Sequence, residues 1–286
     1  MLDPIYEDYL SIDAVFDSIA ACGQNETFGW CLSLATVLHN VAFMSDMLWE
    51  YDSGSYQTEL CAKLDLLASY TDSLLAYSRT FSPEGDLGAG YPYMKSNGRI
   101  RLAAALGYAG IILNNSSYVN HAIYDLFQWQ HPAASITNPG SLGLYVTSSG
   151  VYGEGMAYTT YIFDVLNTFF LAYKRYSGLN LFEHQYVKSI LENSLNCLGP
   201  DFNPLSIDDS VFGSRIHYEN GCVTNISYQP KSFFAMIPYF YQTDEADNKI
   251  RWYLNEYRDK APYWNGNHYC RALILYPCCR ITKIRT

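Results

Sequence analysis

Residues 156–177 form the stretch that most constrains the fold, because they contain neither proline nor glycine. Their apolar and aromatic residues recur at steps of three and four positions: Tyr158, Tyr161, Ile162, Val165, Leu166 and Phe169. This spacing predicts a long amphipathic α-helix, and Gly178 stands where a C-terminal cap belongs. Ser148 or Ser149 is the predicted cap at the other end.

The start of this helix carries a candidate row of acid/base groups. If the helix already includes Glu154, then Glu154, Tyr158 and Tyr161 lie at positions i, i+4 and i+7, on one face. The alternative is structural, because the helix dipole alone favours a glutamate in the first turn. With 27 tyrosines in the chain, many phenols must also be packing groups.

The composition predicts a globular protein of one or two domains, since 49% of its 286 residues are hydrophobic and 16% are charged. The net charge of -10 argues against a general nucleic-acid binder, so an anionic ligand would need a local basic patch. No apolar run approaches the roughly 18 residues of a membrane span. The first residues lack the features of a signal peptide, which leaves a cytoplasmic protein or a fragment of a longer precursor as alternatives. The eight cysteines lack zinc spacing, and we predict neither a metal site nor a cofactor.

Further segments with helical periodicity are 9–22, 28–49, 56–77, 117–129, 184–198, 231–241 and 247–257. Two segments rich in Gly, Ser and Pro, 82–93 and 133–152, are predicted loops. Helix signals vanish over 201–229, which predicts irregular or short extended structure, and 272–276 could be a short strand. The class is therefore all-α, with roughly nine to eleven helices joined as antiparallel pairs. Helix pairs with functional loops at one rim suggest a toroid.

Another helix begins near Ser96 or Asn97, either of which can cap it. Lys95, Asn97, Arg99 and Arg101 make its start the best candidate anion site in this acidic chain, because backbone N–H groups and guanidinium donors converge there. The alternative is a solvated helix end. Small residues permit close packing of this helix: Ala103, Ala104, Gly107 and Gly110.

A third group of polar residues lies in the irregular segment. Asp208 and Asp209 are adjacent acids, which in loops usually cap turns. His217 follows in the same segment and is a candidate binding residue.

Two blocks of the sequence resemble the heparinase II/III and alginate lyase superfamily. One is Gly-x-Tyr-x-Glu-Gly-x-x-Tyr-x-x-Tyr at 150–161, with Ser-Gly-Leu-Asn-Leu-Phe at 177–182. The other is Ser-Asn-Gly-Arg-x-x-x-Ala-Ala-Ala-Leu-Gly at 96–107. The resemblance implies an incomplete α/α toroid, which we place at 1–277. Two features depart from the family: the β-sandwich domain that normally follows the toroid is missing, and the tail at 278–286, predicted to be short, basic and disordered, does not resemble the family. The resemblance also implies a periplasmic or secreted location.

By resemblance, the protein cleaves a uronic-acid polysaccharide by β-elimination. Asn97 would neutralise the substrate carboxylate, and Tyr158 would serve as the general acid/base. Tyr161 would bind substrate or assist, and Tyr152 and Glu154 belong to the same block as candidate substrate-binding residues. A phenolate near neutral pH needs nearby positive charge, because free tyrosine has a pKa of about 10. Arg99 or Arg101 could supply that charge.

Two alternatives remain open from the sequence. A glycoside hydrolase on a related toroid would use Glu154 with Asp208 or Asp209 as its two carboxylates. A non-catalytic carbohydrate-binding remnant would explain why Gly98 stands where the family commonly has histidine.

Overall fold

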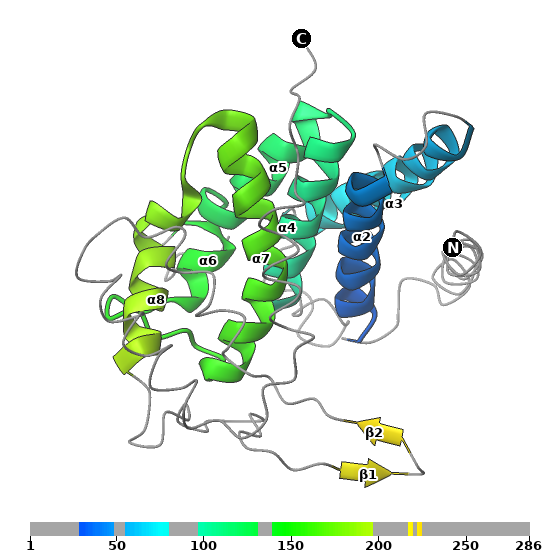
Figure 1. Ribbon diagram of the computed structural model, residues 1–286. Coiled ribbons are helices and arrows are strands. Elements are labelled where there is room, and N and C mark those ends of the chain that lie inside the picture. Colours follow the sequence, from blue (N-terminus) through cyan, green and yellow to red (C-terminus); the bar gives the residue numbers. More distant parts are fainter. Residues whose placement is uncertain are drawn as a thin grey trace.

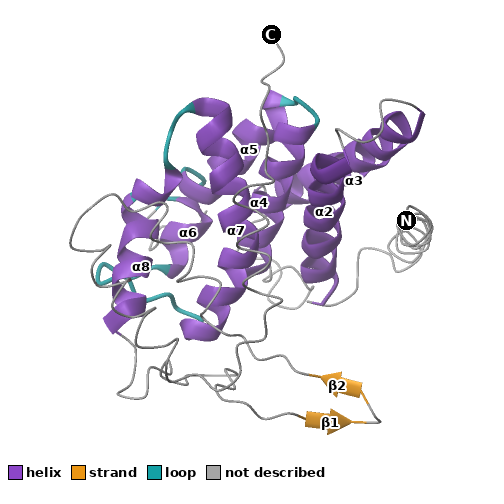
Figure 2. Cartoon of the chain, in the orientation of Figure 1, coloured by secondary structure: helices purple, strands orange, loops and turns teal. Residues whose placement is uncertain are grey.

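The computed structural model describes residues 29–48, 55–79, 97–130, 139–196, 217–219 and 222–224. This part of the chain is all-α except for one short hairpin (Figures 1 and 2). Its helices are α2 (Gly29–Leu48), α3 (Ser55–Arg79), α4 (Asn97–Ile112), α5 (Ser116–Phe127), α6 (Gly140–Tyr145), α7 (Gly155–Ser177), the 3-10 helix η2 (Leu181–Glu183) and α8 (Gln185–Asn196). The hairpin pairs β1 (His217–Glu219) with β2 (Cys222–Thr224) in antiparallel register.

The predicted all-α class is confirmed for the described residues. The helices predicted at 28–49, 56–77, 117–129, 156–177 and 184–198 are present with ends shifted by at most two residues. Gly178 caps α7 in the left-handed conformation, with φ of 79°, as predicted. The loop predicted at 133–152 is wrong in part, because α6 lies within it. Predictions for 9–22, 82–93, 231–241, 247–257, 272–276, 278–286, Asp208 and Asp209 lie outside the described residues.

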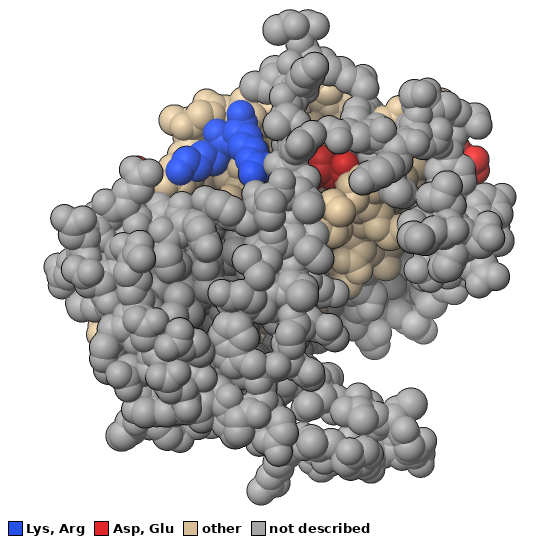
Figure 3. Space-filling view, viewed as in Figure 1, with Lys and Arg blue, Asp and Glu red and all other residues tan. Residues whose placement is uncertain are grey.

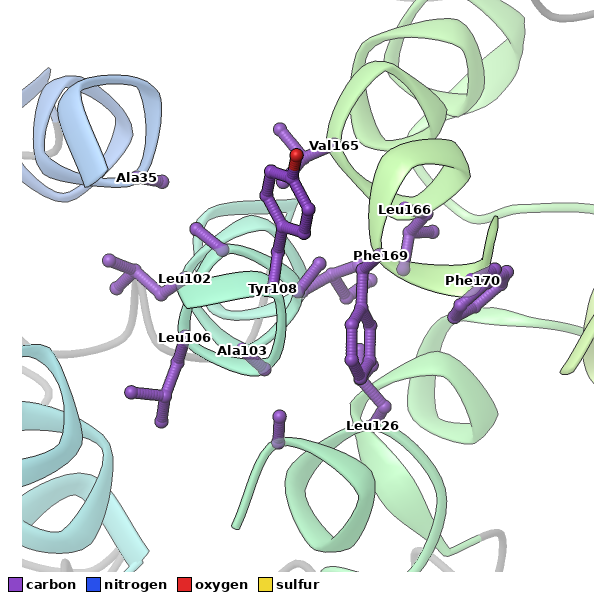
Figure 4. Close-up of a cluster of buried hydrophobic side chains, with 14 of the residues drawn as sticks. Ala35, Leu102, Ala103, Leu106, Tyr108, Leu126, Val165, Leu166, Phe169 and Phe170 are labelled. Carbon is purple, nitrogen blue, oxygen red and sulfur yellow. The ribbon is translucent and has the colours of Figure 1, made fainter. Parts of the chain in front are cut away.

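Helix α4 lies at the centre of the helices. Every residue from Asn97 to Ile111 is buried, and α4 packs against α2, α3, α5 and α7. Figure 4 shows the side chains of Leu102, Leu106 and Tyr108 leaving α4 in different directions toward its neighbours. A helix that is covered on every side must be apolar or small all round, which matches its alanine-rich middle. None of the described helices is long and apolar enough to cross a bilayer.

Glycines let α4 approach two neighbouring helices closely, as the small residues predicted. A Cβ on Gly107 would overlap the Phe169 ring of α7 and lie 2.9 Å from the Ala122 Cβ of α5. A Cβ on Gly110 would lie 2.9 Å from the Tyr118 Cβ. Since core side chains are packed near crystal density, these contacts require glycine at both positions.

Helices α2, α4 and α7 run in the same direction. Where α4 contacts α7, the residue numbers increase along both helices in the same direction: Asn97 contacts Glu154, Arg101 contacts Tyr161, and Gly107 contacts the Phe169 ring. The same holds for α2 and α4: Thr36 with Arg101, and Asp46 with Tyr108. The three helices stand side by side in Figure 1. Their N-terminal ends therefore lie at the same end of the structure.

Helices α3 and α5 run in the opposite direction. Where α4 contacts α5, the residue numbers decrease along α4 as they increase along α5: Gly110 contacts Tyr118, Gly107 contacts Ala122, and Arg99 contacts Asp125. Where α3 contacts α5, the residue numbers increase along both helices in the same direction: Asp65 contacts Tyr118, Asp72 contacts His121, and Arg79 contacts Asp125. The pairs α2–α3 and α4–α5 are therefore antiparallel, and like-directed helices neighbour one another.

Candidate functional site

The site forms where the N-termini of α4 and α7 meet. Glu154 is the N-cap residue of α7, with φ of -96° and ψ of 8°, so it precedes the helix. The predicted row that required Glu154 inside the helix is therefore not formed. The predicted cap at Ser148 or Ser149 is also wrong, because Val146 and Tyr152 pair across a tight turn and delay the start of α7.

Several hydrogen bonds of this site converge on the Glu154 carboxylate. It accepts hydrogen bonds from the Asn97 backbone N–H at 2.9 Å and from the Asn97 side-chain amide at 3.1 and 3.3 Å. It also accepts one from the Tyr152 hydroxyl at 2.6 Å. A carboxylate is favoured here because it faces the positive end of α4. The predicted anion site at the start of α4 is thus already held by a carboxylate of the chain.

The orientation of Asn97 follows from this contact. An ionised carboxylate can only accept hydrogen bonds, so the amide NH2 must face Glu154 and the carbonyl must face away. Asn97 is fully buried, and its Oδ1 has no hydrogen-bond partner among the described residues. The amide donors of Asn97, rather than its acceptor, are therefore committed to Glu154.

Two tyrosines next to Glu154 are held in the neutral form. Burial, followed by the negative charge of Glu154 and their hydrogen bond, raises the pKa of Tyr152 well above its usual value. Burial and Glu154 also raise the pKa of Tyr145, whose ring centroid lies 6.1 Å from that of Tyr152. Tyr152 therefore acts as a hydrogen-bond donor at this site and not as a base.

Arg101 connects α4 to the tyrosines of α7. Its guanidinium carbon lies 3.7 Å from the ring centroid of Tyr161. The same guanidinium donates to the Tyr161 main-chain carbonyl and, at 3.1 Å, to the Thr36 hydroxyl. The ring of Tyr158 lies edge-on to that of Tyr161, with centroids 6.4 Å apart. Arg101 therefore places a positive charge beside the Tyr158–Tyr161 pair.

Arg99 faces the opposite side of α4. It is fully buried, pairs with Asp125 of α5, and stacks 3.8 Å above the Trp129 ring. Arg79 of α3 binds both oxygens of the same carboxylate, with its Nε 3.0 Å from Oδ1 and its Nη2 2.5 Å from Oδ2. Burial lowers the pKa of Arg99, and the charge of Asp125 opposes this effect. Arg99 therefore joins α4 to α5 as part of a buried cluster, Arg79–Asp125–Arg99.

The sequence interpretation did not identify Asp125 or Arg79. The available signal was a lone acid inside the apolar segment 117–129, which in a buried helix requires a cationic partner. The sequence also predicted that Arg99 and Arg101 belong either to a free anion site or to a solvated helix end. They are 0% and 4% exposed, so neither description fits. Because they are buried, Arg99 and Arg101 do not form the Lys and Arg surface that Figure 3 shows in blue.

His217 is the first residue of β1, in the hairpin that Figure 1 shows below the helices. It pairs with Thr224 of β2, and no contact joins it to Glu154 within the part of the chain that the structure describes. Within the described ranges, no group of three His, Cys, Asp or Glu residues is arranged to hold a metal ion. The residues brought together are Asn97, Tyr152, Glu154, Tyr158, Tyr161 and Arg101.

Comparison with known proteins gives no match to a family model, to a curated protein or to a solved structure.

Proposed function

We propose that this chain is a polysaccharide lyase that cleaves a uronic-acid polysaccharide by β-elimination. The observation that carries the proposal is the contact between Asn97 and Glu154. It joins the two blocks that resemble the heparinase II/III and alginate lyase superfamily, although 57 positions separate them. A periplasmic or secreted location goes with such a substrate.

The direction of the helices supports an anionic ligand. Because α2, α4 and α7 are parallel neighbours, their N-terminal ends lie together on the side of Asn97. Each N-terminus carries about half a positive elementary charge. This end therefore attracts anions although the whole chain has a net charge of -10.

The arrangement also supports an incomplete α/α toroid. In that architecture, helix hairpins follow one another so that like-directed helices line up in two layers. The parallel set α2, α4 and α7, with the antiparallel pairs α2–α3 and α4–α5, fits an arc of such a toroid.

The proposed reaction removes the proton from C5 of a uronate residue and expels the 4-oxygen. The Asn97 amide neutralises the adjacent carboxylate, which makes the C5 proton more acidic. Tyr158 takes that proton in its phenolate form, and the C4–O bond breaks as the C4–C5 double bond forms. The Tyr158 phenol then gives a proton to the departing oxygen and returns to its starting state. Arg101, stacked on Tyr161, supplies positive charge beside these phenols.

Incubation of the purified chain with alginate, heparan, chondroitin and other uronates tests the proposal. The expected product carries a conjugated double bond, which is followed by its ultraviolet absorbance. Hydrolytic products without this absorbance would favour a glycoside hydrolase instead. Sugar binding without any turnover would favour the non-catalytic carbohydrate-binding alternative.

Tyr158→Phe is expected to reduce kcat by about 10²- to 10⁴-fold, because it removes the proposed acid/base group and keeps the ring. Steady-state rates of alkene formation measure this effect. Tyr176→Phe is the matched control, since Tyr176 is another half-buried tyrosine near the opposite end of α7. Equal rates for Tyr158→Phe and the wild type would remove Tyr158 from the mechanism.

A further inference from the structure

We infer that the Glu154 carboxylate occupies the position of the ligand carboxylate in the resting protein, and that an acidic sugar binds by displacing it from Asn97. This inference rests on the proposed function. It makes Glu154 a residue that determines specificity by competing with the ligand, whereas the motif resemblance made it only a candidate substrate-binding residue.

The hydrogen bonds at the start of α4 carry the inference. Asn97 offers a backbone N–H and a side-chain amide, and both donate to Glu154. Asn97 is fully buried and its Oδ1 is an acceptor, so it cannot offer another donor from that side. A substrate carboxylate can therefore reach these donors only after Glu154 has left them.

Two carboxylates cannot share these donors. Like charges about 4 Å apart repel each other even in aqueous or surface surroundings. The exchange of one carboxylate for another instead conserves both the charge and the hydrogen bonds at the positive end of α4. A neutral sugar conserves neither, so the resting contact favours acidic ligands over neutral ones.

The position of Glu154 permits this exchange. Glu154 is only half-buried, precedes the first turn of α7, and stands between Gly153 and Gly155. Gly155 has φ of 80°, in the region that favours glycine. The Tyr152 hydroxyl also donates to Glu154, so the displaced carboxylate keeps a hydrogen-bond donor that does not belong to α4.

The test compares binding of an oligouronate with binding of its carboxyl-reduced, neutral counterpart by calorimetry. Glu154→Gln keeps the size of the side chain and removes the competing charge. It is expected to bind the oligouronate about fivefold to tenfold more tightly than the wild type, and the neutral probe about equally. Glu183→Gln is the matched control, because it makes the same change of charge at an exposed position beyond the other end of α7. It is expected to leave both affinities unchanged.

A second measurement needs no variant. In the wild type, NMR titration with the oligouronate should shift the Glu154 carboxyl carbon and the Asn97 side-chain amide, while the neutral probe should not. The inference is overturned if Glu154→Gln binds the oligouronate no more tightly than the wild type and the Glu154 resonance of the wild type does not move on binding. That outcome leaves the proposed function standing. Absence of binding by every form of the protein overturns both.

Discussion

Asp125→Ala is expected to destabilise the protein by about 3–5 kcal/mol, the largest effect that we predict for a single polar residue. Asp125 is fully buried and is the shared partner of Arg79 and Arg99. Its removal would leave a fully buried guanidinium without its carboxylate and would place two cations against each other. The loss would loosen α4 from α3 and α5 together.

Urea unfolding followed by circular dichroism measures this change. Asp65→Ala is the matched control, because Asp65 also joins α3 to α5 by accepting from Tyr118, but at the exposed surface. Its effect should stay within about 0.5 kcal/mol. If the two variants lose the same stability, the buried cluster contributes no more than a surface contact.

Gly150→Ala is expected to cost about 2–5 kcal/mol, because a positive φ and a main-chain contact act together. Gly150 has φ of 82°, and an added Cβ would overlap the Ser189 carbonyl oxygen and lie 2.5 Å from its carbon. Main chain cannot move aside as a flexible side chain can. The segment leading to Glu154 would have to shift, so activity should fall as well as stability.

Gly178→Ala separates the two contributions. Gly178 has φ of 79°, but an added Cβ would meet nothing within 4 Å. Only the strain of the left-handed conformation remains, which costs about 1–2 kcal/mol. Thermal unfolding of both variants gives the comparison, and equal losses would mean that the contact with Ser189 adds nothing to the cost of Gly150→Ala.

Much of the helical structure was predictable because its signals are local. Apolar residues at three- and four-residue steps placed α7, and Gly178 placed its end, since only glycine adopts a positive φ at little cost. The glycines and alanines of α4 predicted close helix packing for an equally local reason. The N-cap of α7 was not predictable in this way, because Ser148 and Ser149 lie in the turn between the paired residues Val146 and Tyr152.

The candidate site was predictable only in part. The two motif blocks pointed to Asn97 and Glu154, and these residues are in contact. Their relation could not be read from spacing, since a helix start and a glutamate 57 positions later meet only when α4 and α7 pack in parallel. The sequence suggested an open anion site, and the folded chain places its own carboxylate there.

The sequence by itself determined the all-α class, the positions of most described helices and the need for small residues along α4, because these depend on neighbours within a few turns. The tertiary structure alone decided what the charged residues of α4 do. A guanidinium near a helix start is ordinarily solvated, and burial costs it several kcal/mol unless partners compensate. The partners come from outside α4: Asp125 of α5 and Trp129, just after α5, for Arg99, and Tyr161 of α7 for Arg101. Only packing brings those partners within reach, and so only packing decides which charges remain for a ligand.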